Sequence, residues 1–196
     1  MTINREELIS DLLARTEGAT AKVKALKHLT TEELNAREFE GRWSALECIE
    51  HLNLYGDFYL PEIESRILKQ QPSPAATVFR SGIIGNYFAG LMQVKNGKLT
   101  KMSSPADKNP IGSELSPTTL DRFLKQQERL KALLEESRSI DLTKTKSAIS
   151  LSRWITLRLG DTFRFFVYHI ERHVQQAENT LLKLRQGAGS ELLEKK

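Results

Sequence analysis

Apolar residues recur every three or four positions in four long segments, and this spacing is the feature that most restricts how the chain can fold. Residues at these spacings share one face of a helix, so the pattern predicts amphipathic helices. The four segments are 4–29, 44–70, 118–136 and 156–184. The last one has the seam pattern typical of bundle helices. We find no run with convincing strand alternation, and therefore expect an all-α protein.

Two capping boxes mark where helices begin. Ser44 is followed three residues later by Glu47, immediately before the second long apolar pattern. Thr30 and Glu33 have the same spacing and predict the start of a short helix that reaches about Phe39. In such a box the hydroxyl accepts from a backbone N–H while the carboxylate reaches back to the cap.

Helix breakers suggest where the regular pattern is interrupted. Pro61 lies inside the second long helix, where a proline removes one backbone hydrogen bond. We therefore expect a kink or break near Leu60. Gly187 and Gly189 are typical of residues that follow the end of a helix. They predict that the last helix stops just before them.

Two stretches lack a long helical period. Residues 71–117 are rich in proline but contain one short helical pattern over 83–91. Residues 139–154 are interpreted as a loop. The sequence thus predicts a four-helix bundle with a long crossover between the second and third long helices. We expect a single domain over 1–185, followed by a frayed C-terminal tail over 186–196.

Composition narrows the class of protein further. The 196 residues are 39% hydrophobic, which is enough for one continuous core. Their net charge of +4 is spread among mixed signs, without the tight basic cluster that nucleic-acid binding needs. No apolar run reaches the roughly 18–20 residues of a membrane span. Cys48 is the single cysteine, and the first residues lack a secretory signal pattern, so we expect a cytoplasmic protein.

Three of the four histidines are candidate metal ligands. His169 and His173 are four residues apart, so both imidazoles project from one helix face, which Phe166 shares. His51 lies in the middle of the second long helix, which could lie opposite that face. Three neutral imidazoles with one open position form the ligand set of a reactive metal site. The spacing alone equally allows histidines that are ordinary core residues.

The other candidate ligands have simpler explanations. His28 follows two lysines near a helix end, where the helix dipole favours positive charge. Glu171 is not directly after His169, as a zinc-protease motif requires, so we expect Glu171 and Arg172 at the surface. Cys48 is one turn from His51 and is either a fourth ligand or a buried, inert thiol.

Two segments resemble the DinB-like superfamily. The first is Trp43-Ser-Ala-Leu-Glu-Cys-Ile-Glu-His51-Leu, which is similar to the family's second-helix signature. The second is 165–176, in which His-x-x-x-His is followed by a glutamine. The segment that ends in Leu159-Gly-Asp161 and the loop ahead of the third long helix also fit. The resemblance covers nearly the whole chain, and the order and separation of the motifs make it specific.

The resemblance implies a four-helix bundle with a crossover and one divalent metal ion held by His51, His169 and His173. The family is similar in part to bacillithiol- and mycothiol-dependent transferases and to a thiol-dependent isomerase. It therefore implies a metal-dependent transferase that moves a low-molecular-weight thiol onto an electrophile. Sulfur ligands suit Zn(II) or Ni(II). Because neutral imidazole binds the metal, affinity should fall as the pH drops through the histidine pKa of about 6.5.

The crossover and the second helix offer candidate substrate contacts. Aromatic and apolar side chains could line a pocket, namely Tyr55, Tyr87, Phe88 and Met92. A carboxylate of the thiol could meet Lys95, Lys98 or Arg80. The alternative is a packed crossover helix beside a solvated basic loop.

Two other functions remain open. A metal-dependent hydrolase would need a general base, for which Glu47 is the obvious candidate, although its place in the capping box already explains it. The chain could also be a non-catalytic, stress-related binding protein. The second long helix is apolar almost all round, so part of it could be covered by a second copy, and we expect a homodimer.

Overall fold

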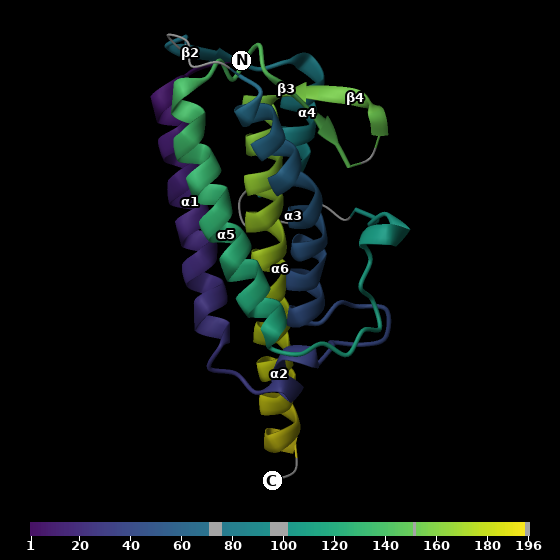
Figure 1. Ribbon diagram of the computed structural model, residues 1–196. Coiled ribbons are helices and arrows are strands. Elements are labelled where there is room, and N and C mark those ends of the chain that lie inside the picture. The colour runs from purple at the N-terminus through teal and green to yellow at the C-terminus, as the bar shows by residue number, and fades with distance from the viewer. Residues whose placement is uncertain (71–75, 95–101, 151, 195–196) are drawn as a thin grey trace.

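The computed structural model is a bundle of four long helices with small strands at one end (Figure 1). The helices are α1 (Arg5–Leu26), α3 (Ala45–Leu68), α5 (Thr118–Glu136) and α6 (Leu159–Glu194). The structure describes residues 1–70, 76–94, 102–150 and 152–194. Both α1 and α3 contact α5 and α6, so the four helices surround one core. The predicted all-α bundle is confirmed.

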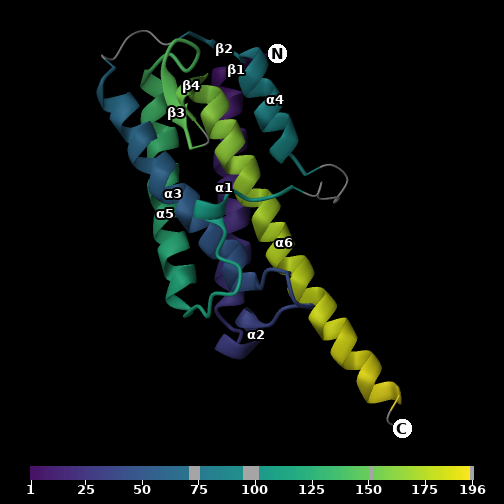
Figure 2. The same cartoon turned by 90° about the vertical axis from the view of Figure 1, so that its right-hand side faces the viewer.

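The predicted crossover is also present. Helices α3 and α5 run in the same direction, so the chain must return along the bundle between them (Figure 1). This connection carries β2 (Val78–Arg80), α4 (Ile83–Met92) and a short 3-10 turn (Ala106–Lys108). Helix α4 packs against α6 (Figure 2). Further along the crossover, the 3-10 turn contacts α3.

Both capping boxes form as the sequence predicts. At the start of α3, the Ser44 hydroxyl accepts from the Glu47 amide at 3.1 Å, and the Ser44 amide donates to the Glu47 carboxylate at 2.7 Å. Thr30 and Glu33 make the same pair of bonds at α2 (Thr31–Asn35). This short helix ends at Asn35, so it is shorter than the predicted extent to Phe39.

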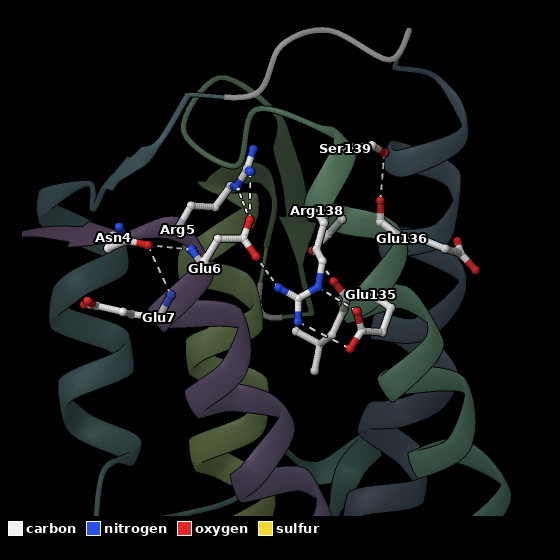
Figure 3. Close-up of polar contacts among 10 residues, drawn as sticks. Asn4, Arg5, Glu6, Glu7, Glu135, Glu136, Arg138 and Ser139 are labelled. Atoms are coloured by element: carbon white, nitrogen blue, oxygen red, sulfur yellow. Dashed lines mark hydrogen bonds and ion pairs between the residues drawn. The ribbon is translucent and has the colours of Figure 1, made fainter.

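Polar contacts join the first turn of α1 to the end of α5 (Figure 3). The Asn4 side chain caps α1 by accepting from the amides of Glu6 and Glu7. Arg138, just after α5, donates to the carboxylates of both Glu6 and Glu135. These contacts lie at the exposed end of the bundle, where ion pairs contribute little stability but help fix the orientation of neighbouring helices.

Two small antiparallel sheets were not predicted. Strand β1 (Thr2–Asn4) pairs with β2, and β3 (Lys146–Ile149) pairs with β4 (Ser152–Arg158). The interpretation of 139–154 as a loop is therefore wrong, and α6 begins at Leu159. Ser147 explains part of the error, because a polar residue occupies an inward position of β3. Its hydroxyl is satisfied by the Thr162 hydroxyl at 2.6 Å.

The expected breaks in two helices do not occur. Helix α3 continues through Pro61, and α6 continues past Gly187 to Glu194. Pro61 is exposed, and it leaves without a helical partner only the carbonyl of Asp57, also an exposed residue that water can reach. Glycine disfavours a helix by only about 1 kcal/mol relative to alanine, so it need not end one.

The core runs between the four long helices. Its largest fully buried side chains come from all four and from β2, and they include Ile9, Leu12, Tyr59, Ile63, Phe79, Phe123, Phe163 and Phe166. Within the described ranges, no helix is both long enough and apolar enough to cross a membrane.

Candidate metal centre

Three histidines meet between α3 and α6. His51 projects from α3, and His169 and His173 project from α6. One ring nitrogen of each lies within 4.8 Å of the others. The Nε2 atoms of His51 and His169 are 3.2 Å apart. Because α3 and α6 pack side by side, the i, i+4 pair on one helix faces the single histidine on the other.

The geometry of the cluster fits a divalent metal ion. Two histidine nitrogens at Zn–N distances of 2.0–2.1 Å in a tetrahedral site lie about 3.3–3.4 Å from each other. The 3.2 Å separation of the His51 and His169 Nε2 atoms is close to this value. Three nitrogen donors could therefore hold an ion and leave a coordination position open.

No further His, Cys, Asp or Glu side chain joins these three histidines in the described part of the chain. Cys48 is fully buried, and burial raises the pKa of its thiol, so the thiolate form needed for metal binding is disfavoured. Cys48 is therefore an inert core residue. His28 is exposed on the turn after α1 and lies outside the cluster, as expected.

Hydrogen bonds at the outer ring nitrogens set the tautomers of two histidines. The Nδ1 of His51 lies 2.5 Å from the Lys108 carbonyl oxygen, which accepts a hydrogen bond from the Nδ1–H group and leaves Nε2 with its lone pair. The Nδ1 of His173 lies 3.0 Å from Oε1 of Gln176, which has the same effect. His169 is held instead by ring packing, stacked on Phe165 at 5.8 Å between ring centroids.

Burial keeps the three rings neutral. The exposed fractions of His51 and His169 are 2% and 3%, while His173 keeps intermediate exposure. Burial lowers the pKa of His51 to about 4, although its hydrogen bond to the Lys108 carbonyl opposes the shift. Burial, together with the neighbouring histidines and Arg172, holds the pKa values of His169 and His173 well below the ordinary 6.5. The three rings are therefore in the neutral form that a metal ion would require at neutral pH.

Aromatic rings enclose the cluster. Trp43 lies 4.7 Å from His51 and 5.6 Å from His173 between ring centroids, and its indole N–H donates to Asn109 at 3.0 Å. Tyr55 lies 4.9 Å from His51 and 4.4 Å from His169. Burial raises the pKa of Tyr55 to about 12, so its hydroxyl stays protonated at neutral pH.

The predicted substrate contacts lie at different distances from this centre. Tyr55 touches two of the histidines. Phe88 is partly buried and faces Phe165, whose ring stacks on His169. Tyr87 is 63% exposed and touches Phe88.

The remaining predicted contacts are spread along the crossover. Met92 is buried at the end of α4, and Arg80 is exposed on β2. Lys95 and Lys98 lie outside the described residues.

Sequence reasoning missed several groups around the site, namely Trp43, Phe165 and the Lys108 carbonyl. Trp43 could have been found, because it directly precedes the cap of the helix that carries His51. The backbone carbonyl of Lys108 has no signature in the sequence.

The prediction that Glu171 and Arg172 lie at the surface is wrong for Arg172. Only 6% of Arg172 is exposed, and burial lowers the pKa of its guanidinium. Glu171 is partly exposed and accepts two hydrogen bonds from Arg15 of α1, at 2.9 and 3.1 Å. Helix α6 is covered on more than one side, so more of its residues are buried than a single apolar stripe predicts.

Glu47 is fully occupied by structural contacts. Burial opposes its ionisation, but hydrogen bonds from Arg37 and the Ser44 amide dominate and lower its pKa. Arg37 donates to both carboxylate oxygens, at 2.8 and 3.0 Å, and the Ser113 amide donates at 3.1 Å. A carboxylate held in this way is a poor proton acceptor.

The fold and the cluster define a class of protein: a four-helix bundle with a crossover and three histidines between two helices that could hold a metal ion. The chain belongs to the DinB superfamily, whose family model matches residues 13–177. The match includes all three histidines and the whole crossover. No curated protein and no solved structure matches the chain closely enough to count as similar.

Proposed function

We propose that this protein is a metal-dependent transferase that moves a low-molecular-weight thiol onto an electrophile. His51, His169 and His173 would hold one divalent ion, Zn(II) or Ni(II). The observation that carries the proposal is the convergence of three buried imidazole nitrogens within 4.8 Å of one another, a set that would leave a bound ion an open coordination position. Membership of the DinB superfamily supports it, because parts of that family are similar to thiol-dependent transferases.

The surrounding residues suit such a reaction. When bound, the ion would act as a Lewis acid and favour the nucleophilic thiolate form of a thiol. Trp43 and Phe165 pack against the histidines and exclude water from their faces. Tyr55 keeps its proton and can donate a hydrogen bond to a substrate atom beside His169.

We propose three aromatic residues as substrate contacts, namely Tyr55, Tyr87 and Phe88. Tyr55 belongs to the wall of the metal centre, and Phe88 reaches it through Phe165. Tyr87 lies at the exposed side of this row of rings, where a substrate would first meet it.

The two alternative functions have less support. A hydrolase with Glu47 as general base conflicts with the four hydrogen bonds that already bind this carboxylate. A purely structural or binding role does not account for three buried histidines whose nitrogens converge as a metal ion would require. Turnover with a thiol would separate the transferase from both alternatives.

The first test is the metal content of the purified protein. We expect about one equivalent of a divalent ion by elemental analysis, and its loss when any one of His51, His169 or His173 is replaced by alanine. His28→Ala is the matched control and should keep the ion. Variants that retain a full equivalent, or a wild-type protein that takes up no ion at neutral pH, would refute the proposed centre.

The second test is a screen of thiols and electrophiles with the metal-loaded and metal-depleted protein. We expect a thioether product only when metal is present. Metal uptake without turnover on any thiol would favour the non-catalytic alternative, and hydrolysis without a thiol would favour the hydrolase.

We also propose a homodimer that forms through apolar surface outside α3. The apolar residues of α3 are largely covered by α5, α6 and neighbouring segments of the same chain. Five exposed large apolar residues in the described part of the chain lie on α4 and β4, namely Ile83, Ile84, Tyr87, Trp154 and Ile155. Light scattering should give about twice the 22.3 kDa of one chain, and a monomer mass would contradict the proposal.

A further inference from the structure

A small apolar cavity lies where five elements meet, one aromatic ring away from the metal centre. Its volume is about 10 Å³. Tyr59 of α3, Phe88 of α4, Ile149 of β3, Leu157 of β4 and Phe165 of α6 line it. This volume is at the lower limit for a single water molecule, and a water would also need two to four polar partners. The lining offers only the Tyr59 hydroxyl, which already contacts the Ser150 amide and hydroxyl.

The inner wall of the cavity is continuous with the histidine cluster. Phe165 lines the cavity, and its ring stacks nearly parallel to His169, with an angle of 9° between the planes. Tyr59 lines it too and stacks on Tyr55, which touches both His51 and His169. An apolar group in this cavity would therefore lie behind a single layer of rings from the ligands.

The outer wall of the cavity can open at Phe88. Four of the five lining residues are buried, and Phe88 alone is partly exposed. It belongs to α4, a helix of ten residues that also carries the exposed residues Ile83, Ile84 and Tyr87. Rotation of the Phe88 side chain toward solvent would enlarge the cavity without moving any residue of the four-helix core.

We infer that this cavity is the closed form of a binding site for an apolar, flat group, such as an aromatic ring. The Phe88 side chain closes the site toward solvent, and Phe165 forms its inner wall. Charged and strongly polar groups are excluded, because the one polar side-chain group of the lining, the Tyr59 hydroxyl, already has partners in Ser150. We assign this apolar group to the electrophilic substrate, and this assignment rests on the proposed transferase function. The binding of an apolar ring in the cavity does not depend on that function.

Toluene binding to the metal-free protein, followed by NMR, tests this inference. In the wild type, toluene should shift the ring signals of Tyr59, Phe165 and His169 in a saturable way. Phe88→Ala removes the ring that closes the cavity and should lower the dissociation constant for toluene about tenfold, which corresponds to about 1.4 kcal/mol. The dissociation constant of Phe88→Leu should lie between those of Phe88→Ala and the wild type. Ile83→Ala, on the same helix but 93% exposed, is the matched control and should leave the constant unchanged.

Two results would overturn the inference: equal toluene affinities for Phe88→Ala, Ile83→Ala and the wild type, or toluene shifts that spare Phe165 and His169. Both results are measured on the metal-free protein. Failure of metal uptake would refute the proposed function and leave the cavity result standing, so the two failures are distinguishable.

Discussion

His51 and His173 each use one ring nitrogen for a hydrogen bond within the chain and leave the other for a metal ion. The partner of His51 is a backbone carbonyl, which mutation cannot remove directly. The partner of His173 is the side chain of Gln176, one turn further along α6. Such outer contacts hold the ring in the orientation and tautomer that binding needs.

Replacement of Gln176 by leucine should therefore weaken metal binding while all three ligands remain. We expect a loss of about 10–100-fold in affinity, the usual effect of removing an outer partner. Competition with a chromophoric chelator would measure it. Gln175→Leu is the matched control, because Gln175 contacts Asn179 and none of the histidines. Equal affinities for the two variants would show that Gln176 does not orient His173.

The lowered histidine pKa values predict how stability depends on pH. Below about pH 6.5 an unfolded chain protonates its histidines, whereas His51 in the folded, metal-free protein resists protonation until about pH 4. The unfolded state thus binds more protons in this window, so the free energy of unfolding falls as the pH is lowered through it. For one such histidine the slope approaches about 1.4 kcal/mol per pH unit.

Urea unfolding of the metal-free protein between pH 4 and 8 would measure this slope. His51→Gln should reduce the slope, and His28→Gln should not, because His28 is exposed. Because the pKa of His51 is lowered to about 4, metal affinity should persist below pH 6.5 and fall nearer pH 4. This revises the expectation from the sequence, which placed the loss of affinity near pH 6.5. If His51→Gln left the slope unchanged, the lowered pKa of His51 would not be the cause of the pH dependence of stability.

At the scale of elements, the start of α3 has the strongest local support, and that start fixes the position of His51 two turns later. The capping box satisfies two backbone amides, and Arg37 neutralises the buried Glu47 carboxylate. The arrangement links α3 to the segment after α2 and, through Ser113, to the end of the crossover.

Glu47→Ala should therefore lower stability without removing the metal. We expect the free energy of unfolding to fall by about 2–4 kcal/mol, because Arg37 and two backbone amides lose their partner. Glu33→Ala is the matched control, since Glu33 has the same place in the exposed capping box of α2 and should cost about 1 kcal/mol or less. Loss of metal from folded Glu47→Ala would instead favour a role at the metal centre.

The elements show which sequence signals can be trusted. Helix α5 was predicted with both ends correct, because its apolar stripe is regular and its ends lie in polar sequence. The β3–β4 hairpin was missed because the polar Ser147 is buried while the apolar Trp154 and Ile155 are exposed, which reverses the usual pattern. Hydrogen bonding and packing against neighbours decide such short strands, and neither is visible in a local window.

At the scale of the whole molecule, the site depends on helices that are distant in the sequence. The i, i+4 spacing predicts that His169 and His173 share a face, but only the packing of α3 on α6 brings His51 to them. The resemblance to the DinB-like family supplied that pairing before the structure did. The contribution of the Lys108 carbonyl could not be predicted, because it depends on where the 3-10 turn of the crossover contacts α3.

The same packing predicts that a metal ion stabilises the protein but is not needed for folding. Helices α3 and α6 already share a large buried core, so the metal-free protein should remain folded. An ion at 100 times its dissociation constant adds about 2.7 kcal/mol by mass action, which for a chain of this size raises the thermal midpoint by roughly 5–10 °C. Calorimetry with added Zn(II) and then with a chelator should show this rise and its reversal.

His51→Ala should show neither, while His28→Ala should behave as the wild type does. An equal rise in His51→Ala would mean that the ion binds elsewhere, and unfolding of the wild type on chelation would mean that the metal is required for the bundle itself.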